Sequence, residues 1–365
     1  MGFFKNIFGT KHKPIETKEE FWDWFASNES EFGAAVRTKD AGQMERRIFG
    51  PLAQRLNELR PDSIFFQMGM ADSSTAELVL TPEGIPKNIG FTEELVAAAP
   101  QLTGWMFTAL KRPEKSTYIE LNGLAFGVDT LQFYPNDHAD MPDLVDITIV
   151  HEDFGGSSDD TIKRGTYLFL DNFLGELDFL TKIDEISFAN AAEAEKPLIP
   201  LDALPNFLDT RAALFIEKYD GVRLFTENDS HSLLEAELSN CKRLVATVNT
   251  DLLTWDRRAS HPWMLVVTIQ YPGSQNGGLP TSETAEQLNA IEDAVTTQLR
   301  DQDGYLNIGR HAAENERAIF YACIDFRKPS KVLDEVVRQY NGPLSIDYRI
   351  LSDKYWQSVD HFRQK

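Results

Sequence analysis

The sequence predicts an α+β protein of two domains, the second of them ferredoxin-like. In the last third of the chain, residues 243–365, the apolar periodicity changes in the order strand–helix–strand–strand–helix–strand. The N-terminal half begins with helices and continues with short strands, without a regular βαβ alternation. Between them, residues 189–206 are rich in alanine, glutamate and proline, which is typical of a linker.

We therefore expect four segments along the chain. They are a basic leader (1–16), an N-terminal α+β domain (17–188), a linker (189–206) and a C-terminal domain (207–365, core 243–365). A length of 365 residues agrees with two or three domains. The leader is expected to be a short helix docked on its own domain or a frayed end, and an anchor on a membrane surface or partner is the alternative.

In the N-terminal domain, Thr17 followed by Glu20 is the pattern of a capping box, so we expect a helix to begin there. Its aromatic residues include Trp22 and Trp24, which we expect in the core and which would bind a partner only if exposed. Further helices are expected at 42–59, 91–98 and 159–174, and strands at 64–70, 77–81, 105–110, 117–121, 131–134, 144–150 and 183–188.

The C-terminal domain is expected to start with a helix at 207–218, a short strand at 222–226 and a helix at 231–239. Ser282 is the expected N-cap of the following long helix, because Glu283, Glu286 and Glu292 then fall early in the helix or on its outer face. The predicted core consists of strands at 244–253, 263–271, 305–311, 317–325 and 344–350, helices at 282–300 and 329–340, and a closing helix at 353–363.

Composition and charge limit the classes of function. The chain is 42% hydrophobic and 25% charged, which is typical of soluble globular proteins. Its formal net charge of −21 repels nucleic-acid phosphates and anionic membranes. The same charge suits a basic protein partner or simply keeps the chain soluble. We expect no direct binding of nucleic acid.

The cysteines and the apolar runs indicate a compartment. Cys241 and Cys323 both lie in apolar runs and are expected as buried thiols rather than as a disulfide. No apolar run is long enough to span a bilayer, and no secretory signal is present. We therefore expect a cytoplasmic protein without a membrane span.

Several short motifs in the C-terminal third carry a resemblance. They include His261-Pro262-Trp263, Gly278-Leu279-Pro280, Gly309-Arg310 and the late Trp356. As a set they resemble the bacterial domain of unknown function 695, for which the resemblance implies no activity. That domain is in turn similar in size and topology to the regulator of ribonuclease activity B family, small acidic proteins that bind an RNA-degrading enzyme. No site residue follows from either resemblance, and the N-terminal module looks like an uncharacterised companion of such domains.

Motifs for common chemistries are missing from the sequence. It contains no phosphate loop, no GxGxxG, no HExxH and no GxSxG. The seven histidines show no ligand spacing, so we expect neither a metal nor a cofactor. The glycines and serines at 155–158 open a helix, but neighbouring aspartates make a helix cap the better interpretation than a phosphate site.

Two glutamates and two arginines are the remaining candidates. Glu83 and Glu283 stand beside turns or at element starts, where a partly buried carboxylate serves as a general acid or base. Turn and capping roles are the simpler interpretation. Arg310 and Arg317 flank a hairpin and would either clamp a carboxylate or pair with Glu314 and Glu316, which we favour.

The sequence thus predicts architecture better than activity. The leading hypothesis is a non-enzymatic protein-binding or regulatory protein, in a specific version one that inhibits a basic partner such as a nuclease, as a regulator or an immunity factor. The alternative is an enzyme with a carboxylate-based site between the domains. The oligomeric state does not follow from the residues.

Overall fold

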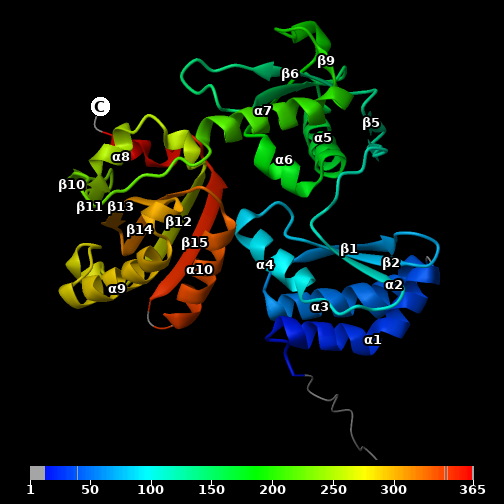
Figure 1. Ribbon diagram of the computed structural model, residues 1–365, viewed down its shortest axis with the longest axis horizontal. Coiled ribbons are helices and arrows are strands. Elements are labelled where there is room, and N and C mark those ends of the chain that lie inside the picture. Colours follow the sequence, from blue (N-terminus) through cyan, green and yellow to red (C-terminus); the bar gives the residue numbers. More distant parts are fainter. Residues whose placement is uncertain (1–12, 39, 341, 343, 364–365) are drawn as a thin grey trace, which may run out of the picture. The chain divides into compact units, whose positions relative to one another are not determined.

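The structure is a computed structural model that describes residues 13–38, 40–340, 342 and 344–363, so most of the predicted leader lies outside the described residues. It divides into two compact units, Met1–Lys111 and Arg112–Lys365, and both mix helices with strands (Figure 1). The α+β prediction is confirmed. The boundary between the two units lies between Lys111 and Arg112. The predicted linker, residues 189–206, falls inside the second unit.

The N-terminal unit packs helices on a small sheet. Its elements are α1 (Lys18–Thr38), α2 (Ala41–Met44), a π-helical turn (Glu45–Phe49), α3 (Gly50–Leu59), β1 (Phe65–Met70), β2 (Ala76–Thr81), α4 (Pro86–Ala97) and β3 (Trp105–Ala109). The strands lie in the order β1-β2-β3, antiparallel and then parallel. The crossover from β2 to β3 contains α4, as parallel strands require.

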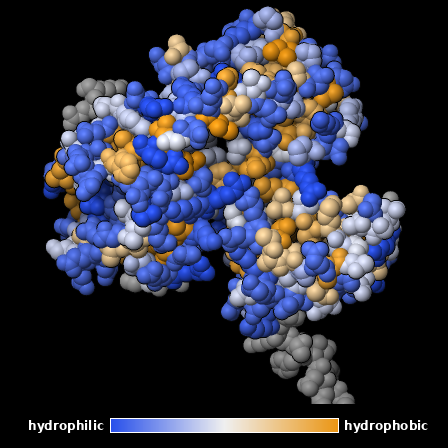
Figure 2. Space-filling model, in the orientation of Figure 1, coloured by the Kyte–Doolittle hydropathy of each residue, from blue (hydrophilic) through white to orange (hydrophobic). Residues whose placement is uncertain are grey.

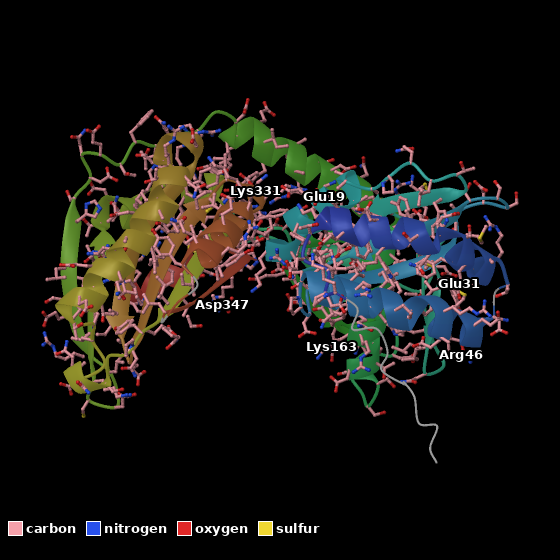
Figure 3. All side chains as sticks on the ribbon, turned by 90° about the horizontal axis from the view of Figure 1, so that it is seen from below. Glu19, Glu31, Arg46, Lys163, Lys331 and Asp347 are labelled. Atoms are coloured by element: carbon pink, nitrogen blue, oxygen red, sulfur yellow. The ribbon has the colours of Figure 1, made fainter. Side chains whose placement is uncertain are left out.

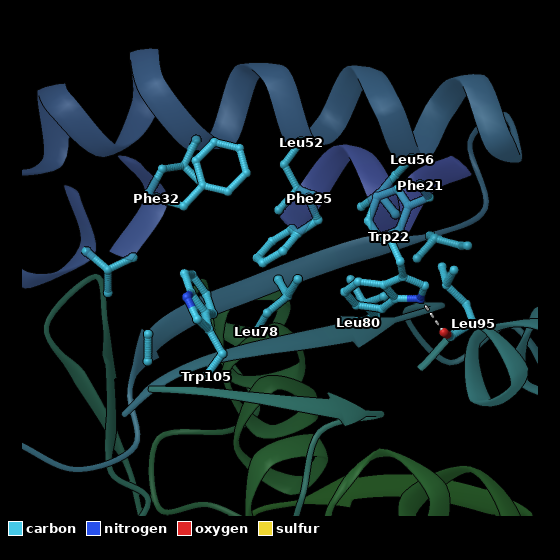
Figure 4. Close-up of a cluster of buried hydrophobic side chains, with 14 of the residues drawn as sticks. Phe21, Trp22, Phe25, Phe32, Leu52, Leu56, Leu78, Leu80, Leu95 and Trp105 are labelled. Atoms are coloured by element: carbon cyan, nitrogen blue, oxygen red, sulfur yellow. Dashed lines mark hydrogen bonds between the residues drawn. The ribbon is translucent and has the colours of Figure 1, made fainter. Parts of the chain in front are cut away.

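Aromatic residues of α1 fill the core of this unit (Figure 4). Phe21 and Phe25 are fully buried, and the indole Nε1 of Trp22 donates a hydrogen bond of 2.6 Å to the carbonyl oxygen of Leu95. Trp24 is half-buried and packs under the guanidinium of Arg55. Both tryptophans therefore stabilise the unit's interior rather than forming an exposed binding surface.

The predicted capping box is present at the start of α1. The backbone N–H of Glu20 donates to the Thr17 hydroxyl at 3.1 Å, and the Glu20 carboxylate accepts from the Thr17 N–H at 3.3 Å. We expect Thr17→Ala to lower the free energy of unfolding of this unit by about 1 kcal/mol, because an N-terminal amide loses its acceptor. Urea denaturation measures this, with Ser27→Ala in the exposed middle of α1 as a near-neutral control. An equal loss in both variants would contradict the capping role.

The first part of the second unit contains a two-stranded sheet, formed by its first two strands, and a four-stranded sheet. Its elements are β4 (Ile119–Leu121), β5 (Leu124–Phe126), β6 (Gln132–Asn136), β7 (Asp146–Val150), α5 (Asp159–Leu174), α6 (Glu176–Lys182), β8 (Glu185–Ala189), β9 (Ile199–Pro200) and α7 (Leu204–Tyr219). The sheet order is β8-β7-β6-β9. The residues expected to form a linker include β9, which is an edge strand of this sheet. Leu201 and Leu204 beside it are fully buried in the core, and this burial stabilises an ordered segment despite the alanine, glutamate and proline around it.

At the start of α5 the carboxylate of Asp159 accepts hydrogen bonds from the backbone N–H groups of Gly155 and Gly156, at 2.8 and 2.9 Å. These are the amides that a phosphate would need, so the structure agrees with the capping interpretation.

A six-stranded antiparallel sheet forms the rest of the second unit. Its elements are β10 (His231–Glu237), β11 (Arg243–Asn249), α8 (Thr250–Thr254), β12 (Trp263–Gln270), α9 (Ser282–Gln298), β13 (Tyr305–Ala313), β14 (Glu316–Cys323), α10 (Arg327–Gln339) and β15 (Ser345–Ser352). The strand order is β10-β11-β13-β14-β12-β15. From β12 to β15 the chain runs β-α-β-β-α-β, as the sequence predicts.

The two faces of this sheet are covered differently. Helices α9 and α10 lie on one face, and α8 with the C-terminal segment lies on the other (Figure 1). On the second face Trp356 is fully buried and its Nε1 donates to the carbonyl oxygen of His261 at 3.0 Å. A 3-10 helix, Gln357–Phe362, closes this side, where the sequence predicts an α-helix over 353–363.

Three further predictions in this region are wrong. Residues 231–239 form the strand β10 instead of a helix, because pairing with β11 and the packing of Leu234 override the helical propensity of the leucines and glutamates. No strand occurs at 222–226, a stretch that the structure describes in full. Cys241 is exposed in the turn between β10 and β11, whereas Cys323 is buried as expected.

Charged side chains cover the outer surfaces of both units, among them Glu19 and Glu31 on α1 and Lys163 on α5 (Figure 3). Hydrophilic residues dominate the face in view in Figure 2. Among the described residues, no helix combines the length and the apolar character that a bilayer crossing requires.

Candidate functional site

A pocket of about 300 Å³ opens on the helix-bearing face of the six-stranded sheet. Strands β11, β13 and β14 form its floor, and the loop before α9 forms a wall. The lining residues are Val245, Thr247, Asn276, Leu279, Pro280, Arg310, His311, Ala312 and Arg317. The pocket therefore combines apolar walls with two guanidinium groups.

Strand register brings the two arginines to one face. Arg310 pairs with Thr247 on β11, and Ala312 pairs with Arg317 on β14, so all four side chains point the same way. A bulge between Asn307 and Gly309 sets this register. Gly309 has φ +152° and lies against β11, where a Cβ would meet the Thr247 carbonyl oxygen at 2.5 Å, so this position requires glycine.

A single buried carboxylate lies between the arginines. The Glu292 Oε2 atom, on α9, is 2.6 Å from Nη1 of Arg310 and 3.8 Å from Nη1 of Arg317. The side chains of Glu292 and Arg317 are only 8% and 7% exposed, and that of Arg310 is 33% exposed. Two guanidinium groups thus share one carboxylate, and in the described part of the chain no second carboxylate forms an ion pair with either of them, which leaves one positive charge uncompensated at the pocket.

Hydrogen bonds hold this group in place. Arg317 Nη1 donates to Asn289 at 2.8 Å, and Asn307 donates to Glu292 Oε1 at 3.2 Å. The Nε atom of Arg317 is buried and has no acceptor in the described part of the chain. Burial lowers the pKa of Arg317, and the charge of Arg310 lowers it further. Burial and a neighbouring cation both oppose the charged form of this guanidinium, whereas a nearby anion such as Glu292 favours it.

Arg310 and Arg317, the two arginines that the sequence singles out, lie side by side in the pocket. The favoured prediction that they pair with Glu314 and Glu316 is wrong. Glu314 accepts from Lys242 at 3.1 Å, and Glu316 accepts from Gln270 at 2.5 Å. The hairpin turn directs these two glutamates away from the arginines and toward the neighbouring strand ends.

The glutamates proposed as acid or base occupy surface positions. Glu83 has a positive φ of 52° in a turn, and its half-exposed side chain lies 3.4 Å from the Lys111 ammonium. Glu283 is exposed in the first turn of α9. The N-cap of that helix is Thr281 instead of the predicted Ser282, since the Thr281 hydroxyl accepts from the Thr284 N–H. Neither glutamate lines the arginine pocket, and among the described residues neither belongs to a group of three or more His, Cys, Asp and Glu side chains that could hold a metal ion.

Glu292 is not among the site residues that the sequence predicts. Its position in the sequence predicts the outer face of the helix, yet only 6% of the residue is exposed. The signal was present, because Glu292 lies four residues after Leu288 and three before Val295, on the same buried stripe. A lone acid in an apolar stripe indicates a buried cationic partner.

His261 is a second buried polar group outside the pocket. It is fully buried, its Nδ1 lies 2.8 Å from the Ser260 hydroxyl, and its Nε2 has no partner among the described residues. Burial and then the charge of Arg223 lower its pKa to about 4. No group of three or more potential metal-ligating side chains exists in the described part of the chain.

The lowered pKa of His261 predicts acid sensitivity. Between about pH 6.5 and pH 4 the unfolded chain binds a proton that the folded chain does not, so stability falls as the pH falls through this window. The slope is at most about 1.4 kcal/mol per pH unit. Denaturation of wild type and His261→Gln over this range measures it, and the variant should lose that part of the slope. The exposed His231→Gln is the control, and equal slopes in all three proteins would exclude His261 as the cause.

Residues 238–362 match a family of unknown function, DUF695. This match confirms the resemblance stated for the C-terminal third. The DUF695 segment contains the whole pocket, including both arginines and Glu292. No curated protein and no solved structure matches the chain, and the ferredoxin-like assignment stays a prediction.

Proposed function

We propose that this protein is a non-catalytic binding protein whose DUF695 segment takes up an anionic group of its ligand in the arginine pocket. The observation that carries the proposal is the pairing of Arg310 and Arg317 with one shared carboxylate, Glu292. A buried cation without a full counter-charge costs free energy, which an incoming anion offsets. The site is therefore better suited to an anion than to a neutral or cationic ligand.

The dimensions and the lining support a small group. A volume of about 300 Å³ lies at the lower end of ligand pockets and fits one side chain or a compact acid. Guanidinium groups bind carboxylates with two parallel hydrogen bonds, and Arg310 is exposed enough to offer such an edge. Val245, Leu279 and Pro280 supply apolar walls for the rest of the group.

The pKa values of the polar groups at the pocket favour a binding site over a catalytic one. General acid–base catalysis needs a group that titrates near neutral pH. Beside the pocket, burial raises the pKa of Tyr271 to about 12, and its hydroxyl donates to the carbonyl oxygen of Gly278 at 3.0 Å. Glu292 is held by both arginines. The lining histidine, His311, has its pKa lowered to about 4 by burial and then by the charge of His361, so it does not titrate near neutral pH either.

Titration with simple anions tests the proposal. Acetate, butyrate and phosphate are added to isotope-labelled protein, and amide shifts in β11 and β13 are followed by NMR. We expect saturable binding that Arg310→Gln weakens about tenfold or more, since a charged hydrogen-bond pair is lost. Arg300→Gln, at an exposed ion pair elsewhere, should bind as wild type does. If no anion shifts these amides in the folded wild type, the proposal is wrong.

The acidic surface supports a second candidate. A net charge of −21 favours a basic protein partner, in the specific version a nuclease that this protein inhibits in a bacterial cytoplasm. The test is RNA hydrolysis by an extract of the host, with and without added protein, at low and high salt. Inhibition that salt removes and that Arg310→Gln leaves unchanged would favour this candidate over the pocket.

A further inference from the structure

We infer that the ligand of the pocket is an extended acidic–apolar segment of a partner protein, which crosses strands β13, β11 and β10. This inference rests on the proposed function and names its partner. The carboxylate of the segment binds at Arg310 and Arg317, and an apolar side chain of the segment packs on Leu233.

Strand register lines up the surface for such a segment. Arg310 on β13 pairs with Thr247 on β11, and Thr247 pairs with Leu233 on the edge strand β10. Directly paired residues point to the same face, so the three side chains form one row across the sheet. Neighbouring strands are about 4.8 Å apart, so the row spans about 10 Å from the arginine strand to the leucine strand.

This part of the helix-bearing face is open. On the inner strands the residues under the helices, such as Ile319 and Val267, are fully buried. Val245 and Thr247 on β11 are only partly covered, and Leu233 on β10 is 68% exposed. Covering the exposed apolar surface of Leu233 would therefore add to the stability of a complex at this pocket.

The loop before α9, which forms a wall of the pocket, is held in place before any ligand binds. The Tyr271 hydroxyl and the N–H of Asn315 both donate to the carbonyl oxygen of Gly278, at 3.0 and 2.9 Å. Gly278 has φ +87°, and a Cβ there would lie 3.0 Å from the backbone N of Glu314. The loop is thus tied to the β13–β14 turn, and a ligand binds without first ordering it.

The geometry sets the spacing within the ligand. An extended segment in the polyproline II conformation advances about 3.1 Å per residue with three residues per turn, so side chains three positions apart share one face and lie about 9 Å apart. One uncompensated positive charge calls for one carboxylate, and a pocket of about 300 Å³ holds a single acidic side chain. The expected segment therefore carries glutamate or aspartate three positions from a leucine-like residue.

Three synthetic peptides test the inference by calorimetry and NMR. The matched peptide is acetyl-Gly-Glu-Gly-Gly-Leu-Gly-amide. The second replaces its glutamate by glutamine, and the third places glutamate and leucine next to each other. We expect the matched peptide to bind about tenfold more tightly than either of the others, which corresponds to the loss of one charged contact or one apolar contact.

Variants separate this inference from the function on which it rests. Leu233→Ser should weaken the matched peptide about tenfold and leave acetate binding unchanged, while Arg310→Gln weakens both. Leu214→Ser, at an exposed leucine on α7, is the matched control and should change neither.

If acetate binds but Leu233→Ser and the peptide spacing have no effect, the crossing segment is wrong and the anion pocket stands. Phosphate binding that is tight while all three peptides bind weakly would also overturn the inference, in favour of a free anion. If neither anions nor peptides bind, both proposals fail.

Discussion

Replacing Glu292 by glutamine is expected to lower the free energy of unfolding of the second unit by about 3 kcal/mol. The substitution keeps the shape of the side chain but removes the carboxylate that Arg310 and Arg317 share. Arg317 is then a buried cation with a neutral amide, Asn289, as its acceptor. Denaturant unfolding followed by tryptophan fluorescence measures the loss.

The neighbouring Asp293→Asn is the matched control, since Asp293 is exposed on the same helix and should change stability by less than about 0.5 kcal/mol. The double variant Glu292→Gln with Arg317→Met should be more stable than Glu292→Gln alone, because it removes the unpaired charge. Added acetate should stabilise Glu292→Gln more than wild type, since it replaces the missing anion. A Glu292→Gln variant as stable as wild type would show that the arginines need no counter-charge, and the argument for the pocket would fail.

Replacing Lys354 by methionine is expected to cost a similar amount, about 3 kcal/mol. The Lys354 ammonium lies 2.5 Å from Oδ2 of Asp184 and 3.2 Å from the carbonyl oxygen of Asp143, and both charged side chains are less than 10% exposed. Methionine keeps the apolar stem but leaves the Asp184 carboxylate buried with fewer partners. Because Asp184 directly precedes β8 and Lys354 follows β15, this contact connects the four-stranded and the six-stranded sheets of the second unit.

A polar cluster around Asp143 supports the same connection. Its carboxylate accepts hydrogen bonds from Lys218, Tyr219 and Tyr355 at 2.8–2.9 Å. Burial opposes ionisation of Asp143, but these hydrogen bonds prevail and lower its pKa. Hydrogen exchange of Lys354→Met should therefore rise in both β8 and β15.

The control for this prediction is Asp209→Asn, which breaks an exposed ion pair with Lys182. It should leave stability within about 0.5 kcal/mol of wild type. Faster exchange in β15 alone, with β8 unchanged, would contradict a connecting role for Lys354.

Much of the fold follows from local sequence patterns. The capping box at Thr17 and Glu20, the helix over 159–174 and the β-α-β-β-α-β order of the C-terminal third all appear where the residues predict them. Each depends on neighbours within a few positions in the chain. The strand β10 does not, because its local propensity is helical and only pairing with β11 makes it a strand.

In the candidate site, too, some features follow from local sequence and others depend on tertiary contacts. That Arg310 and Arg317 lie close together follows from the residues alone, since they flank one hairpin, and so does the strong acidity of the chain. Their partner does not, because Glu292 lies 18 residues before Arg310 along the chain and reaches it through the packing of α9 on the sheet. Charge pairing depends on distance in space and on burial, and both are set when separate elements pack together.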